Sequence, residues 1–395
     1  MQQELIAGKR QTMRRLTAAI AVGALALTAC GASDAAENGT GPIRIGLSTP
    51  LSGSAASLGE SERKGVELAI ADINDSGGVL TGRRLELVVQ DNACNPTDGA
   101  SSVSKLITQD DVSALIAALC SGVTLAAMPI VQRNKVPMVV ATSTSPDITT
   151  ASGAGGNKFV FRINPSDADL AKALASYLTK GTVRKLAILA EDSTYGRTGA
   201  EALKQALTSN GMSVTVVDYA PQGTSDFATL ISKYRNNGSE AVALYISGAD
   251  HLGFLRQAAA AGLGLPLTGR VELEGDNLTI LGDEQFAGST SVYPYSSIVQ
   301  TAENAAFVKA FQAEYGAPPT YEAFEGYNAV KTLADAIGRA GSGDAEAIQK
   351  ALEQTDLKSL TGGTITFDDH NQAHDKAFIL EVRDGRPVVV ADVTT

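Results

Sequence analysis

Short hydroxyl side chains follow two apolar runs of this sequence, and together they could bind a small anion. Ser121 comes shortly after residues 112–118, and a cluster follows residues 136–141, made up of Thr142, Ser143, Thr144 and Ser145. Hydroxyls and backbone N–H groups beside a helix N-terminus suit a carboxylate, because several donors and the helix dipole converge on it. Serine and threonine also cap helices, which would explain either cluster alone. Two clusters at neighbouring strand ends favour the anion site.

Catalytic and metal chemistry find little support in the other residues. The sequence has three histidines, His251, His370 and His374, and none stands at the carboxyl end of an expected strand, where a triad base would be needed. The spacing of His370 and His374 could hold a metal on a helix, but their neighbours predict a hairpin turn. Neither a nucleophile elbow, a phosphate-binding P-loop, a zinc-protease motif nor a dinucleotide fingerprint is present. We expect no metal, no cofactor and no enzyme, since a hydrolase would require a base near Ser121 or Ser143.

The N-terminus has the pattern of an export signal. A basic run precedes an uncharged apolar stretch at 16–29, which as a helix would span about 21 Å and so could not cross a hydrocarbon core of about 30 Å. A signal peptide at 1–29 is therefore expected. The sequence Leu-Thr-Ala-Cys ending at Cys30 resembles a bacterial lipobox, in which the cysteine is acylated. Ordinary signal cleavage near Cys30 is the alternative.

Export also bears on the other two cysteines and on the charge. In an oxidising compartment, Cys94 and Cys120 should pair by default, the alternative being two buried thiols.

The formal net charge of −11 argues against nucleic acid as a partner. The polar stretch at 30–41 predicts a flexible tether. No later run of 18 apolar residues exists, so no other segment is expected to span a membrane.

The rest of the chain alternates between strand and helix patterns, which predicts α/β architecture. In the first half, strands are expected at 43–47, 85–90, 112–118 and 136–141, with helices at 59–76, around 103–107 and at 124–134. Such βα units form a parallel sheet covered on both faces. The alternation of strands and helices is interrupted at 142–157, a stretch rich in Ser, Thr and Gly, and a second series of strands and helices of similar size follows.

The second series predicts another doubly wound βα lobe. Its expected strands are at 159–163, 186–190, 213–219 and 241–246, and its expected helices at 167–178, 196–209, 227–234 and 251–261. Helices at 302–315 and 322–339 follow, and the tail should form strands at 365–367 and 377–382 with a polar turn between them. Ligands of such sheets bind at the carboxyl ends of the strands, which predicts a cleft between the lobes.

Several short motifs, in this order and spacing, resemble the leucine/isoleucine/valine-binding protein family, the type I periplasmic solute-binding proteins of ABC importers. They are Pro-Leu-Ser-Gly at 50–53, Ala-Asp-Ile-Asn at 71–74, Asp-Asn-Ala-Cys-Asn-Pro at 91–96, Leu-Cys-Ser at 119–121, Thr-Ser-Thr-Ser-Pro at 142–146, Tyr-Gly at 195–196 and Phe-Leu-Arg-Gln-Ala at 254–258. The resemblance extends from Ile43 to Val390. It implies a three-segment hinge, with lobe 1 at 42–163 and 294–363 and lobe 2 at 164–293 and 364–395.

The resemblance also implies roles for individual residues. Ser121 and Thr144 match hydroxyls that bind the ligand carboxylate, alongside the backbone of Thr142 and Ser143. Tyr195 matches an aromatic residue that closes over the ligand from the second lobe. Glu272, with Glu274 as the alternative, should bind the ligand ammonium, and Cys94–Cys120 matches the family disulfide.

The cleft departs from the family pattern at three places. Ser57 and Leu58 stand where an aromatic is common, the loop at Ser247 lacks a tyrosine, and Phe324 stands where a larger aromatic can occur. These positions predict a roomier cleft for an amino acid or a related carboxylate or amide, branched-chain ligands included.

The expected protein is therefore a monomeric, lipid-anchored receptor on the outer face of the cytoplasmic membrane. It would capture its ligand by hinge closure and deliver it to the permease subunits of an ABC importer. A ligand sensor that signals to a membrane partner is the alternative on the same scaffold.

Overall fold

A five-stranded parallel sheet forms the first half of the chain. The computed structural model describes residues 41–273 and 275–394, so the expected signal peptide, Cys30, most of the tether and Glu274 lie outside the described residues. The strand order is β2-β1-β3-β4-β5, with β1 at Ile43–Thr49, β2 at Leu85–Asp91, β3 at Ala114–Ala117, β4 at Met138–Val140 and β5 at Val160–Arg162. The order changes direction between β1 and β3, and this switch point is where ligands of such sheets bind.

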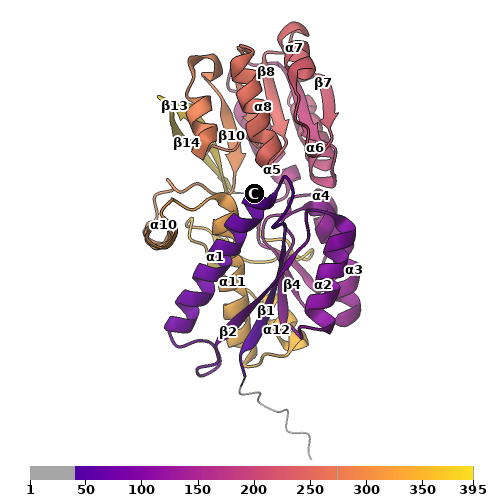
Figure 1. Cartoon of the computed structure of the whole chain (residues 1–395), viewed down its shortest axis with the longest axis vertical. Coiled ribbons are helices and arrows are strands. Elements are labelled where there is room, and N and C mark those ends of the chain that lie inside the picture. The colour runs from indigo at the N-terminus through magenta and orange to yellow at the C-terminus, as the bar shows by residue number, and fades with distance from the viewer. Residues whose placement is uncertain (1–40, 274, 395) are drawn as a thin grey trace, which may run out of the picture. The chain divides into compact units, whose positions relative to one another are not determined.

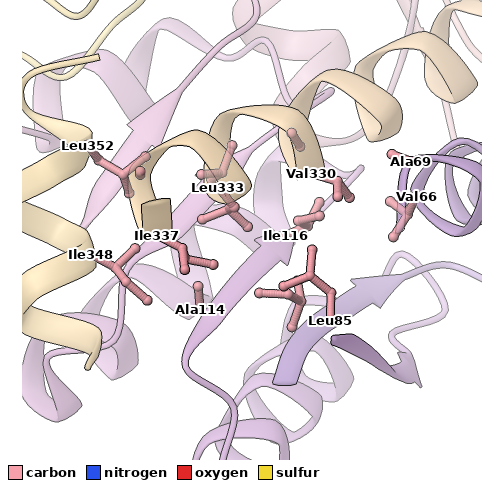
Figure 2. Packing of buried hydrophobic residues seen from close by; sticks show 14 of the residues in the cluster. Val66, Ala69, Leu85, Ala114, Ile116, Val330, Leu333, Ile337, Ile348 and Leu352 are labelled. Atoms are coloured by element: carbon pink, nitrogen blue, oxygen red, sulfur yellow. The ribbon is translucent and has the colours of Figure 1, made fainter. Parts of the chain in front are cut away.

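Helices cover this sheet on both faces (Figure 1). They are α1 (Ala56–Asp75), α2 (Pro96–Thr108), α3 (Ser121–Asn134) and α4 (Pro146–Ala151), joined late in the chain by α11 (Tyr321–Ala340) and α12 (Ala345–Leu352). Successive residues of β3 face opposite layers: Ala114 and Ile116 pack with α11 (Figure 2), and Leu115 and Ala117 pack on the other face. This continuous apolar run is what a strand buried on both faces requires.

Helices α1 and α11 approach each other closely because two glycines face the contact. A Cβ atom on Gly65 would overlap the backbone carbonyl of Ala323, and one on Gly326 would lie 2.5 Å from the carbonyl oxygen of Glu62. Both positions therefore require glycine for steric reasons. The close contact holds the N-terminus of α11 beside the loop after β4, where Tyr321 Oη donates to the Thr142 carbonyl.

A second parallel sheet repeats the winding of the first. Its order is β7-β6-β8-β9, with β6 at Lys185–Glu191, β7 at Ser213–Ala220, β8 at Ala241–Tyr245 and β9 at Leu267–Gly269. The helices of this part are α5 (Asp167–Leu178), α6 (Thr194–Ser209), α7 (Ala228–Asn236), α8 (Gly248–Ala260) and α9 (Gly275–Leu281). The switch point lies between β6 and β8, so each lobe presents one such edge.

An antiparallel sheet of order β10-β13-β14 adjoins β9. Strand β10 is Thr290–Tyr293, β13 is Lys376–Arg383 and β14 is Arg386–Thr394, while a 3-10 turn at Glu284–Phe286 and helix α10 (Ala302–Tyr315) connect it to the rest. The hydroxyls of Thr268 in β9 and Thr290 in β10 lie 2.8 Å apart and link the two sheets.

The structure confirms the α/β class with two lobes, and it contains elements that the sequence pattern did not predict, among them α9, β10, α12 and β14. Within the stretch rich in Ser, Thr and Gly lies helix α4, whose N-cap Ser145 accepts a hydrogen bond from the N–H of Asp147. The expected strand at 365–367 is confirmed only in part: β12 is Thr364–Ile365 and pairs with β11, Leu357–Lys358, while Phe367 forms only an isolated bridge with Ala373. Among the described residues, no helix is both long and apolar enough to cross a membrane.

Candidate functional site

A cavity of about 300 Å³ lies where the strand ends of both parallel sheets meet. The residues that follow the first sheet's strands and line it are Leu58, Cys94, Cys120, Ser121, Thr142 and Thr144. Those that follow the second sheet's strands are Glu191, Tyr195, Ser247, Arg270 and Glu272. Three further residues line the cavity. They are Tyr293 at the end of β10, and Tyr321 and Glu322 at the start of α11.

The loop after β4 borders this cavity through Thr142 and Thr144. Its carbonyl groups all accept hydrogen bonds within the protein: Tyr321 Oη donates to the Thr142 oxygen at 3.2 Å, Arg162 Nη1 to the Ser145 oxygen at 2.7 Å, and the N–H of Asp167 to the Thr144 oxygen at 2.8 Å. Asn164 Nδ2 donates to the remaining carbonyl, that of Ser143, at 3.4 Å.

The N–H groups of the same loop have no such partners. Among the described residues, no hydrogen bond involves the N–H of Thr142, Ser143 or Thr144, nor those of Ser121 and Gly122 in the first turn of α3. A helix leaves its first N–H groups without partners in the helix, and its N-terminus carries partial positive charge. These donors suit a carboxylate.

The side chains of the loop have different partners from its backbone. The Thr144 hydroxyl donates to Asp167 Oδ2 at 2.6 Å, and the Thr142 hydroxyl donates to Glu62 Oε1 at 3.1 Å. Ser121 Oγ accepts from the N–H of Ser145 at 3.3 Å, which leaves its own proton available to a ligand. In this arrangement Ser121 is the hydroxyl donor of the group, and the two threonine oxygens are acceptors.

Three sequence-predicted residues do not line this cavity. The Ser143 hydroxyl is buried and bonds to the Ala118 carbonyl and to Thr124. The Phe324 ring stacks on Tyr295 with centroids 4.1 Å apart, in an aromatic cluster under α10. Ser57 borders an adjoining cavity of about 310 Å³, which shares Leu58, Glu272, Tyr293, Tyr321 and Glu322 with the first.

The second-lobe side combines Tyr195, Ser247 and Glu272. The Ser193 hydroxyl caps α6 and so positions Tyr195, whose ring lies 5.8 Å from that of Tyr245. Ser247 Oγ donates to Glu191 Oε2 at 2.9 Å. Glu272 accepts from the N–H of Gly248 and from Asn277 Nδ2, both at 3.0 Å, and retains acceptor capacity toward the cavity.

Burial raises the pKa values of the acidic groups around the cavity. The pKa of Glu272 is raised to about 7 by burial, against the effect of its N–H donors. That of Glu322 is also raised to about 7 by burial and by the neighbouring Glu272. Burial raises the pKa of Glu191 as well. A ligand ammonium beside Glu272 would favour its charged form.

Sequence reasoning missed Arg270, Tyr293 and Tyr321. The Arg270 side chain is only 3% exposed, and its guanidinium lies over the ring of Tyr293, 4.1 Å from the centroid. The rings of Tyr293 and Tyr321 meet edge to face at 5.3 Å. Arg270 directly follows β9, so a search for polar residues at the carboxyl ends of strands, which located Ser121, could also have found it. The two tyrosines come from elements that carry no distinctive sequence motif.

The remaining predicted features lie near the cavity or away from it. Cys94 and Cys120 form a disulfide with Cα atoms 5.5 Å apart, which joins the loops before α2 and α3. His370 and His374 flank the predicted turn, where His374 Nε2 lies 3.0 Å from Asp368 Oδ2. The described part of the chain contains no group of His, Cys, Asp and Glu side chains that could hold a metal.

Two wound α/β lobes with a cavity where their strand ends meet define a solute-binding protein of the periplasmic type. The chain belongs to the periplasmic binding protein family, whose model matches residues 42–387. Its relatives in this family are binding proteins and not enzymes.

Curated relatives resemble the chain over nearly its whole length. One is the leucine-, isoleucine-, valine-, threonine- and alanine-binding protein of Pseudomonas aeruginosa, 29% identical, with 91% of this chain and 92% of the relative covered. Another is Leu/Ile/Val-binding protein homolog 3 of Brucella melitensis, 30% identical, with 88% and 93% covered.

Solved structures share the same fold. A solute-binding protein of R. palustris in complex with benzoate gives a TM-score of 0.81 at 25% identity, covering 89% of this chain and 96% of that one. The leucine-binding protein of Thermotoga maritima gives a TM-score of 0.77 at 24% identity, covering 89% and 98%.

Proposed function

We propose that this protein captures an amino acid or a related small carboxylate outside the cytoplasm and delivers it to an ABC importer. The observation that carries the proposal is the row of unpartnered N–H groups at Thr142–Thr144, beside the N-terminus of α3. These groups would bind the ligand carboxylate, with the Ser121 hydroxyl as a further donor. The ligands in the relatives' names, branched-chain amino acids and benzoate, all carry a carboxylate.

The second lobe would complete the site when the lobes close. Residues 42–163 with 294–363, and 164–293 with 364–395, are proposed as the two bodies that move about the hinge. Tyr195 would cover the ligand, and Glu272 would accept from its ammonium group, because both line the cavity opposite Ser121. Contacts made only in the closed form would shift the population toward it, and that form is what a permease can recognise.

Lipid anchoring at Cys30 after removal of residues 1–29 is part of the proposal. Its support is the lipobox-like sequence before Cys30 together with the family's extracytoplasmic role. Replacing Cys30 with serine should release the protein from the membrane fraction and abolish labelling by a fatty acid. Unchanged membrane association would contradict the anchor while leaving the binding function standing.

The binding function is tested by a ligand screen on the purified protein. Leucine, alanine, glutamine, glutamate, succinate and benzoate are added in turn, and a ligand that binds only the folded state raises the melting temperature. For the ligand found, Ser121→Ala should weaken binding about 10-fold in calorimetry. Ser101→Ala, at an exposed serine on α2, is the matched control. The proposal fails if no carboxylate raises the melting temperature, or if the two variants bind alike.

A further inference from the structure

The cavity contains one cationic side chain among the described residues that line it, and two of its nitrogen donors have no hydrogen-bond acceptor. Arg270 Nε and Nη1 are buried and form no hydrogen bond with any described residue. No carboxylate of the described chain lies within ion-pair distance of the guanidinium. Buried donors without acceptors are costly, and so they indicate that a ligand group binds there.

The backbone holds Arg270 at this place. Its N–H donates to the Leu244 carbonyl at 2.9 Å, which continues the pairing of β8 with β9 by one residue. Gly269 before it has φ +89°, and a Cβ there would lie 2.8 Å from the Leu244 oxygen. The rings of Tyr293 and Tyr321, with centroids 4.1 and 5.5 Å from the guanidinium carbon, support it by cation–π contact.

The acidic neighbours of Arg270 already have donors of their own. Glu272 accepts from Gly248 and Asn277, and Glu191 accepts from Ser193, Ser247 and Gln222. Asp167 accepts from the Thr144 hydroxyl through Oδ2 and keeps Oδ1 unpartnered, but it does not reach ion-pair distance of Arg270. The buried donors Nε and Nη1 of Arg270 therefore still require acceptors, and none of these carboxylates supplies one.

Two separate groups of donors face the cavity: the N–H groups after β4 in the first lobe, and Arg270 after β9 in the second. We propose that the ligand carries a second acidic group and that Arg270 binds it, which makes the protein selective for acidic amino acids or small dicarboxylates. This inference rests on the proposed function, in which the first carboxylate binds at Thr142–Thr144. A planar guanidinium with two adjacent N–H donors suits a carboxylate in bidentate geometry.

The experiment compares matched ligand pairs that differ only in the second acidic group. Calorimetry is run with glutamate against glutamine, aspartate against asparagine, and succinate against succinamate. The wild-type protein should bind the diacid of at least one pair about 10- to 100-fold more tightly than its amide. Arg270→Gln should reduce that ratio to about 1 and leave the affinity for the amide unchanged. Arg256→Gln, at an exposed arginine of α8, is the control for the loss of one positive charge.

The other possible results distinguish a failure of this inference from a failure of the proposed function. Equal weakening of both ligands of a pair in Arg270→Gln would overturn the inference, because Arg270 would then bind the carboxylate they share. Unchanged affinities would overturn it too, since Arg270 would then serve only the fold. Tighter wild-type binding of leucine, benzoate or the amides than of any diacid overturns it without a variant, even if Arg270→Gln does not fold. The absence of binding by every carboxylate would instead refute the proposed function.

Discussion

Replacing Glu62 with glutamine should stabilise the protein at pH 8 and change its stability much less at pH 5. Glu62 lies on α1 and is 1% exposed. Its carboxylate accepts from the hydroxyls of Thr49 at 2.6 Å and Thr142 at 3.1 Å, so it links the end of β1 to the loop after β4. Glutamine has the same shape and can keep both contacts, because a threonine hydroxyl both donates and accepts.

The magnitude follows from the pKa of this group. Burial raises the pKa of Glu62 from an ordinary 4.5 to about 7, although its two hydroxyl partners act in the opposite direction. A carboxyl group with a raised folded-state pKa contributes stability that is fully present below pH 4.5 and is lost as the pH rises through 7. At about 1.4 kcal/mol per pKa unit, the loss between pH 5 and pH 8 is about 2.5 kcal/mol.

Urea unfolding at pH 5 and pH 8 measures this effect. From pH 5 to pH 8, the free energy of unfolding of the wild type should fall by about 2.5 kcal/mol relative to that of Glu62→Gln. Glu67→Gln removes a partly exposed carboxylate from the same helix and is the control. If Glu62→Gln and the wild type respond equally to pH, Glu62 titrates normally and the reasoning is refuted.

Three further predictions concern the loop, the helix contact and the disulfide. Tyr321→Phe removes one of the two donors to the Thr142 carbonyl, the other being Asn164 Nδ2, and should weaken ligand binding about 5-fold by calorimetry; an unchanged affinity would show that the Tyr321 bond does not position the loop. Gly65→Ala should lower the free energy of unfolding by about 1–3 kcal/mol, since its Cβ would overlap the Ala323 carbonyl; an unchanged urea midpoint would contradict the close packing of α1 on α11. Replacing Cys94 and Cys120 by alanine opens a loop of 26 residues and should cost about 3 kcal/mol, and equal stability of the variant would mean that the bond does not constrain the unfolded chain.

The sequence predicted those parts of the site that follow strands with clear periodicity. Ser121, Thr142 and Thr144 come after the apolar runs that became β3 and β4, and hydroxyl residues at strand ends are visible without a structure. The direction of a side chain in a loop is not visible in this way. Ser143 lies between two residues that line the cavity, yet its hydroxyl bonds to the Ala118 carbonyl, because alternate residues of this extended loop face opposite sides.

Residues from distant segments were harder to predict. Tyr321 reaches the cavity because α11 packs on α1, and that contact depends on glycines at 65 and 326 that have no periodic signal. Tyr293 ends β10, a short strand that pairs with β13 from the C-terminal part of the chain. Arg270 directly follows the short strand β9. In this segment an acidic ligand contact was expected from the sequence, at Glu272, and the arginine two residues earlier was not considered. Contacts between segments that are distant in the sequence thus bring side chains to the cavity, and local sequence patterns do not reveal such contacts.

A crystal structure of the protein with its ligand tests the central claim most directly. The proposal predicts that carboxylate oxygens of the ligand lie about 3 Å from the N–H nitrogens of Thr142–Thr144 and from the Ser121 hydroxyl, with Tyr195 covering the ligand from the second lobe. A ligand that binds elsewhere, or that presents only apolar or cationic groups to this loop, would contradict it.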